Sequence, residues 1–203
     1  MLRISLRTAH TQMTTSPLLP DMYARVDAWK QAADARALFL ECYAMMTHNM
    51  FGGIAAGEFC QRDWAQRLLL DFAGYYFRAL EAYERDPAAA PAVWRHAFEA
   101  TTQTDASPLQ KLLLGVNAHI NFDLAMTLDD LLHDAWPGLS RTQRKVYQTD
   151  YETVNRIIAR TIDAVQDQVL EPAMPIMERV DVIFGPADEW AVARLIGLWR
   201  DKT

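Results

Sequence analysis

Cysteine is scarce in this chain: Cys42 and Cys60 are the only two among 203 residues. Two cysteines are too few for a disulfide framework, and they lack the Cys-x-x-Cys spacing of a redox or zinc motif. We therefore expect a protein that folds without disulfides in a reducing cytoplasm. A single bridge between Cys42 and Cys60 is the alternative.

The sequence also lacks long apolar runs and an excess of positive charge. It contains no stretch of about 18 consecutive apolar residues, which is the length that a membrane-spanning helix needs. Its formal net charge is −6. Because nucleic acids and anionic membrane surfaces are bound by concentrated basic faces, neither is expected as a partner.

The alternation of apolar and polar residues that marks β-strands is nearly absent, as are internal repeats. From Asp21 onward, apolar residues instead recur at spacings of three and four, which is typical of amphipathic helices. This pattern predicts an all-α, single-domain bundle of six or seven helices over residues 21–203. Residues 1–20 have no acidic residue and lack the apolar core of a secretory signal, so they are predicted to be a disordered tail, with a targeting segment as the alternative.

The expected helices are delimited by capping residues, prolines and glycines. Gly52, Gly53 and Gly57 predict a flexible connection after the first helix; they follow no strand and lack a Lys-Ser/Thr pair, so no nucleotide cofactor is expected. Ser140 and Gln143 form the pattern of a capping box. The predicted helices cover 22–47, a segment beginning after Asp63, a short segment through Trp94 and Phe98, 108–134, 140–171, 174–184 and 187–199.

The predicted helix 108–134 carries a polar cluster within apolar sequence, and we expect this helix to be central and buried. His119 and Asp123 are one turn apart on the same face, while Asn117 and Asn121 form a second pair. A carboxylate in this position can orient an imidazole for acid or base catalysis. Burying such groups without partners costs about 1 to 3 kcal/mol each, so the cluster is either a structural network or a working site.

Two kinds of site fit this cluster. In the first, the catalytic residues are His119, which acts as general acid or base, Asp123, which orients it, and Asn117 and Asn121, which position substrate oxygens or polarise a carbonyl. Aromatic residues line the pocket, and the substrate-binding candidates are Trp64, Tyr75, Tyr147 and Tyr151. In the second, His119 and Asp123 bind a divalent metal together with His48 and Asp71. Asp130 and His133 faintly echo a di-iron ligand pair, but the second such segment is missing.

Familiar catalytic signatures are missing, including His-Glu-x-x-His, Gly-x-Ser-x-Gly and the nicotinamide or flavin fingerprint. We therefore expect a small-molecule enzyme of the hydrolase or lyase/cyclase type rather than a redox enzyme. The alternative is a non-catalytic helical module, in which the polar cluster is structural or lines a binding pocket without turnover. Such a module is compatible with a homodimer.

The segment from Gly115 to Leu124 resembles the signature Gly-x-Asn-Ala-His-Ile-Asn-x-Asp-Leu of a bacterial family carried as a domain of unknown function. Segments 72–80 and 94–98 are similar to that family's pattern as well, so the resemblance covers roughly residues 40 to 165. It implies a compact helical fold and directs attention to Asn117, His119, Asn121 and Asp123. It implies no particular reaction.

Overall fold

The computed structural model describes residues 17–173, and all regular elements in that range are helical. This confirms the predicted all-α class. The predicted helices 174–184 and 187–199 lie outside the described residues, as do residues 1–16. The α-helices are α1 (Leu18–Gln31), α2 (Arg36–Ala55), α3 (Arg62–Arg85), α4 (Ala92–Thr102), α5 (Pro108–Ala118), α6 (Leu124–Leu132), α7 (Arg141–Val165) and α8 (Glu171–Ala173). The short connecting turns are the 3-10 turns η1 (Pro87–Ala89) and η3 (Trp136–Gly138) and the π-helical turns η2 (His119–Asp123) and η4 (Gln166–Leu170).

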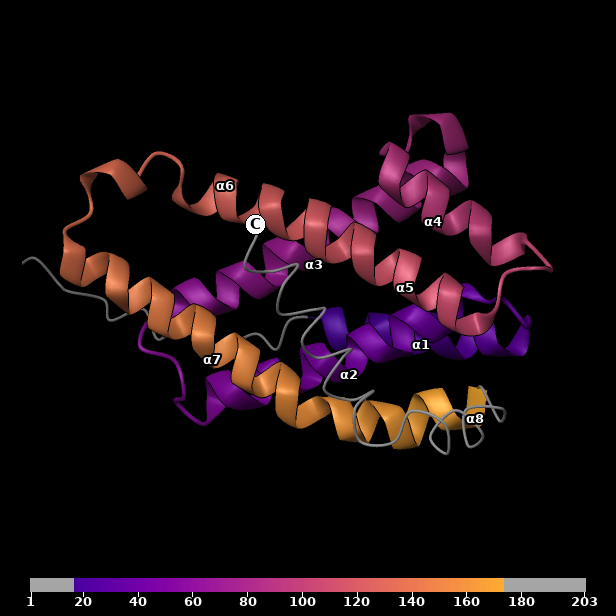
Figure 1. Cartoon of the computed structure of the whole chain (residues 1–203), viewed down its shortest axis with the longest axis horizontal. Helices are drawn as coiled ribbons and strands as arrows, with labels where there is room; N and C mark the ends of the chain where they lie inside the picture. The colour runs from indigo at the N-terminus through magenta and orange to yellow at the C-terminus, as the bar shows by residue number, and fades with distance from the viewer. Residues whose placement is uncertain (1–16, 174–203) are drawn as a thin grey trace, which may run out of the picture.

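Helix α2 is the best enclosed helix of the described chain, because it packs against α1, α3, α5 and α7. Figure 1 shows α5, η2 and α6 joined into one rod that runs above α2. We expected this rod, residues 108–134, to be central and buried on most sides. Instead it has one buried face and one exposed face, on which Asn117, Asn121 and Met126 lie.

The first predicted helix, 22–47, is in fact two helices. The chain breaks at Ala33, whose φ of 51° is left-handed. Asp34 then accepts a hydrogen bond from the backbone N–H of Arg36 at 2.9 Å and binds the guanidinium of the same residue. This local carboxylate starts α2 without any glycine or proline to signal the break. Helix α1 begins at Leu18, so the end of the predicted tail is helical.

The glycine segment belongs mostly to α2 rather than to a flexible connection. A Cβ atom on Gly53 would lie 2.5 Å from Cδ1 of Ile157, so this glycine lets α7 approach α2 closely. Of the three glycines in this segment, only Gly57 has a positive φ, 75°, and it lies just after the end of α2.

Capping side chains explain several helix starts. The predicted capping box of Ser140 and Gln143 is present at the start of α7. The helix predicted to begin after Asp63 begins one residue before it, at Arg62, so Asp63 lies in the first turn of α3 and does not cap it. There the buried carboxylate of Asp150, on α7, accepts the backbone N–H groups of Cys60 and Gln61 at 2.7 and 2.8 Å. A distant acid thus fixes the start of α3.

Two further findings bear on the sequence predictions. Between residues 17 and 173, no helix combines the length and the apolar character needed to cross a membrane. Cys42 is buried, Cys60 is exposed, and both are free thiols, so they do not form the alternative bridge.

Candidate functional site

His119 and Asp123 form a buried hydrogen-bonded pair inside the π-helical turn η2. His119 Nδ1 lies 2.8 Å from Asp123 Oδ2, and the two residues are 4% and 0% exposed. Because an ionised carboxylate only accepts, Nδ1 carries the proton and Nε2 is left with its lone pair. Single π-helical turns within α-helices are often found at functional sites.

Trp94, from α4, is the third member of this arrangement. Its indole Nε1–H donates to Asp123 Oδ1 at 2.9 Å. The hydroxyl of Thr127 donates to the backbone carbonyl of Asp123 at 2.7 Å. Oδ1 of Asp123 thus accepts from Trp94, and Oδ2 accepts from His119. These two hydrogen bonds fix the carboxylate and, through it, the imidazole of His119. The sequence analysis placed Trp94 on a short helix and missed this role, although a buried indole N–H requires an acceptor.

Aromatic rings enclose the imidazole. The Phe72 ring stacks on it with centroids 3.7 Å apart, and the Tyr43 ring meets it at 4.3 Å. Phe39, Tyr76 and Trp94 complete the enclosure at centroid distances of 5.8, 6.2 and 6.1 Å. The predicted open pocket beside His119 is thus replaced by a packed shell of rings from α2, α3 and α4.

Burial controls the charge of this histidine. Removal from water lowers the pKa of His119 below its ordinary value of 6.5, and the hydrogen bond and charge of Asp123 only partly oppose this. The imidazole is therefore neutral at pH 7. Its Nε2 atom is buried and accepts no hydrogen bond from any residue in the range 17–173. Such an unpaired buried acceptor costs about 1 to 3 kcal/mol, which a purely structural histidine would be expected to avoid.

Tyr43 and Thr47 add two more polar atoms to the same interior. Their hydroxyls approach each other one turn apart on α2, but neither completes a hydrogen bond within the part of the chain that the structure describes. Burial and the nearby charge of Asp123 raise the pKa of Tyr43 well above its ordinary value, so its hydroxyl stays protonated. Both residues were absent from the sequence-based candidates, because an apolar helix with one Tyr and one Thr carries no distinctive pattern.

Asn117 and Asn121 are not part of the buried cluster. Both are exposed, and Asn121 Nδ2 donates to Asn117 Oδ1 at 2.8 Å on the outer face of the rod. The expectation that these amides are buried with His119 is wrong, because the rod is covered on one side only. In this structure they do not face the imidazole.

The proposed metal-binding set is not assembled either. His48 is exposed on α2, and Asp71 pairs with Arg67 at 3.3 Å on α3. Within residues 17–173, no group of three or more His, Cys, Asp or Glu side chains is placed to hold a metal ion. His119 and Asp123 are thus brought together without the other two predicted ligands.

The four predicted substrate-binding residues lie in other parts of the fold. The Tyr75 hydroxyl donates to Asp130, and Arg78 covers its ring. Trp64 and Tyr147 contact each other at 5.2 Å, where Trp64 packs on a second apolar cluster. Tyr151 is half-buried on α7. The rings of Tyr75, Trp64 and Tyr147 make no contact with the imidazole in the described structure.

Comparison with known proteins gives one match. Residues 17–203 match the model of a family described as "Family of unknown function (DUF5995)". No curated protein and no solved structure matches the chain. Because the family model covers nearly the whole sequence, including the rod that carries His119 and Asp123, the chain belongs to the family of unknown function DUF5995.

Proposed function

We propose that this protein is a cytoplasmic small-molecule enzyme in which His119 serves as general acid or base. One observation carries the proposal: among the described residues Nε2 of His119 is buried and has no hydrogen-bond partner, while Nδ1 is anchored by the carboxylate of Asp123. This is the arrangement that orients an imidazole for proton transfer. The substrate class is a small molecule that undergoes hydrolysis, elimination or cyclisation.

The contacts of the pair suit such a role. A neutral imidazole can take a proton at Nε2, and the carboxylate of Asp123 then stabilises the imidazolium that forms. The indole of Trp94 holds that carboxylate in place during the transfer. Because the pKa of His119 is lowered by burial, the base form is populated throughout the neutral pH range.

Access requires movement of one aromatic ring. Of the five rings that contact the imidazole in the described structure, only that of Phe72 is partly exposed. Phe72 stacks directly on His119, so it separates the imidazole from the surface on that side. We propose that a change of the Phe72 rotamer admits the substrate.

A second function is favoured by the enclosure itself. Asp123 is fully buried, and His119 is packed by rings on several sides. In this alternative the triad of Trp94, Asp123 and His119 only specifies helix packing, and the protein is a helical binding or interaction module, for example a homodimer.

Carbethoxylation by diethyl pyrocarbonate distinguishes the two without knowledge of the substrate, because the reagent modifies accessible neutral imidazoles. Under the enzyme proposal, His119 of the folded protein is modified faster than the chain unfolds, and Phe72→Ala accelerates this reaction. His133, which is exposed, provides the internal reference. If His119 reacts only at the rate of global unfolding in both proteins, the packing alternative is correct.

Activity screening gives the second test. A panel of small esters, lactones and β-substituted acids is assayed with the wild type, His119→Gln and the matched variant His133→Gln. Loss of an acid-base group costs about 100-fold to 10,000-fold in rate, so His119→Gln should abolish turnover while His133→Gln keeps it. Turnover that survives in a folded His119→Gln variant contradicts the proposed role.

A further inference from the structure

Two buried tyrosines contact the imidazole of His119, and their hydroxyls lie in different surroundings. The Tyr43 ring, from α2, meets the imidazole with centroids 4.3 Å apart, and the Tyr76 ring, from α3, lies at 6.2 Å. Both side chains are buried. The surroundings of each hydroxyl therefore decide whether it can serve the same site as His119.

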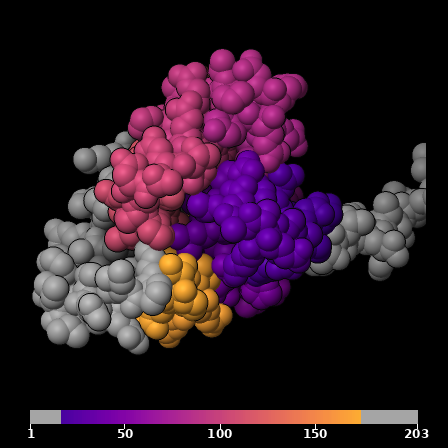
Figure 2. Space-filling model, turned by 90° about the vertical axis from the view of Figure 1, so that its right-hand side faces the viewer, coloured from indigo at the N-terminus to yellow at the C-terminus, as the bar shows by residue number. Residues whose placement is uncertain are grey.

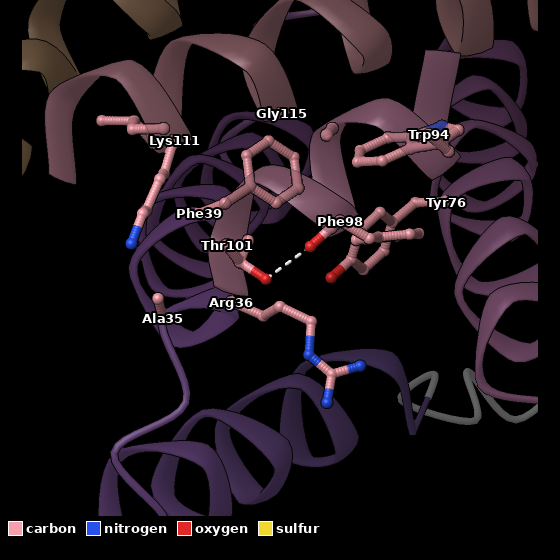
Figure 3. Close-up of a pocket in the computed structure, with 11 residues that line it drawn as sticks. Ala35, Arg36, Phe39, Tyr76, Trp94, Phe98, Thr101, Lys111 and Gly115 are labelled. Atoms are coloured by element: carbon pink, nitrogen blue, oxygen red, sulfur yellow. Dashed lines mark hydrogen bonds between the residues drawn. The ribbon is translucent and has the colours of Figure 1, made fainter. Parts of the chain in front are cut away.

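The hydroxyl of Tyr76 belongs to a small cleft between the start of α2, α4 and the start of α5. Figure 2 views the end of the molecule where α4 and α5 lie against the α1 and α2 region. The cleft has a volume of about 20 Å³, room for about one water molecule. Figure 3 shows the hydroxyl directed toward the space between Thr101 and Arg36. Phe39 lines this cleft and also contacts the imidazole, so its ring separates the cleft from His119.

The hydroxyl of Tyr43 lies instead on the side of the His119–Asp123 pair. Burial raises the pKa of Tyr43, and the carboxylate charge of Asp123 raises it further. Burial also raises the pKa of Tyr76, but the charge that acts most strongly on that residue is that of Arg36. Because charges act most strongly at short range, the two hydroxyls face opposite sides of the aromatic shell.

Three buried polar atoms in the interior around His119 lack a partner among the described residues: Tyr43 Oη, Thr47 Oγ1 and His119 Nε2. Thr47 is 1% exposed and follows Tyr43 by one turn of α2, where its hydroxyl approaches the phenol. The protonated phenol can donate a hydrogen bond, whereas Nε2 of the neutral imidazole can only accept one. The interior thus offers one donor and one acceptor to a guest.

The ring of Phe72 contacts both groups. It stacks on the imidazole with centroids 3.7 Å apart and meets the Tyr43 ring edge-on at 6.0 Å. A planar molecule of the size of one ring, taking the place of Phe72 after its rotamer change, would therefore lie against both His119 and Tyr43.

The charge of this interior favours a neutral guest. Asp123 is 0% exposed, and its carboxylate acts on both Tyr43 and His119. A second negative charge would be repelled by this carboxylate and would lose its hydration among aromatic rings. Charged acids are thus disfavoured as substrates.

We propose that Tyr43 is a second catalytic residue of this site and that the substrate is a neutral carbonyl compound. The Tyr43 hydroxyl donates to the carbonyl oxygen while Nε2 of His119 removes a proton from the adjacent carbon. The electron pair of the broken C–H bond forms the C=C bond of an enolate, the carbonyl π pair moves onto oxygen, and the proton rests on Nε2. This assignment rests on the proposed function of His119 and adds the class of its substrate.

The test uses cyclopentanone, a neutral ketone of the size of one ring, and pyruvate, a charged ketone, as its control. Proton removal is followed by ¹H NMR in D₂O, because each cycle replaces a hydrogen beside the carbonyl by deuterium. The full-length wild type should exchange cyclopentanone with saturation kinetics and pyruvate no faster than buffer does. Tyr43→Phe should slow this exchange about 100-fold to 1,000-fold. Tyr76→Phe keeps its ring and removes only the hydroxyl at the cleft, so it should leave the rate unchanged.

A second measurement does not depend on turnover. A carbonyl group that accepts a hydrogen bond absorbs infrared light at a lower wavenumber. Bound ¹³C-labelled cyclopentanone should therefore absorb at a lower wavenumber in the wild type, Tyr76→Phe and His119→Gln than in Tyr43→Phe.

Three results would overturn the inference: unchanged exchange in a folded Tyr43→Phe variant, equal exchange of the two ketones, or no exchange of cyclopentanone above buffer. The comparison of the two ketones uses the wild type, so it stands even if a variant fails to fold. If turnover of esters or lactones depends on His119 while neither ketone exchanges, the role of His119 holds and the substrate class is wrong. If turnover survives in a folded His119→Gln variant, the proposed function itself fails.

Discussion

The same rod carries two histidine–aspartate pairs that have equal spacing and opposite surroundings. His119 and Asp123 lie 2.8 Å apart with side chains 5% and 0% exposed. Asp129 and His133, at the end of α6, lie 2.9 Å apart with side chains 64% and 73% exposed. The contact is nearly identical, so the surroundings decide what each pair does. Water and salt screen the outer pair, whereas the inner pair is held by Trp94 and packed by rings.

The largest difference should appear when the acid is removed from each pair. Asp123→Ala leaves the Trp94 indole N–H and the His119 Nδ1–H without acceptors in the core, so we expect a loss of about 3 to 5 kcal/mol in the free energy of unfolding. Asp129→Ala should change it by less than about 0.5 kcal/mol. Urea denaturation of both variants measures this. Equal losses would mean that burial does not distinguish the two pairs.

A smaller effect is expected when only the donor to the inner carboxylate is removed. Trp94→Phe keeps an aromatic ring in the core but takes the N–H away from Asp123, at a cost of about 1 to 3 kcal/mol. The matched variant is Trp64→Phe, since the buried Trp64 indole N–H has no partner among residues 17–173 and its removal breaks no hydrogen bond there. A loss in Trp64→Phe as large as that in Trp94→Phe would show that ring size, rather than the hydrogen bond, accounts for the effect.

The smallest expected effect is a pH dependence confined to the inner pair. Burial lowers the pKa of His119 in the folded protein below its ordinary value of 6.5. At a pH just below 6.5, the imidazole is therefore mostly protonated in the unfolded chain and still mostly neutral in the folded protein. The unfolded state then holds more protons, and stability falls as the pH falls from 6.5 toward the lower folded pKa.

Urea midpoints between about pH 7.5 and about pH 5 test this dependence. The wild type should lose more stability on acidification than His119→Gln, and His133→Gln should follow the wild type. If His119→Gln and the wild type lose stability in parallel, His119 does not titrate with a lowered pKa.

Local sequence patterns predicted the parts of the fold that local chemistry determines. The capping box at Ser140 and Gln143 was found, because both partners lie within four residues. The break at Ala33 was missed, because one carboxylate, Asp34, makes it in an alanine-rich segment. The cap from Asp150 joins residues about 90 positions apart, and no local pattern reveals such a contact.

In the candidate site, too, the features set by neighbouring residues were predictable, and those set by contacts between distant residues were not. The pairing of His119 with Asp123 follows from their spacing, and their burial from the apolar residues around them. The spacing of Asn117 and Asn121 is equally regular, yet these amides face outward, because the sequence does not show which side of the rod is covered. Trp94 and Tyr43 reach His119 from α4 and α2, so their roles depend on tertiary packing.

The π-helical turn also determines how the rest of the rod is oriented. Hydrogen bonds in such a turn span one residue more than in an α-helix, so η2 accommodates the equivalent of a single inserted residue. If these residues were wound as a regular α-helix instead, α6 would be rotated by about 100° about the axis of the rod. Asp130 would then swing away from the Tyr75 hydroxyl, and α6 would present a different face to α3. The five residues of η2 thus determine which face α6 turns toward α3, in addition to placing His119.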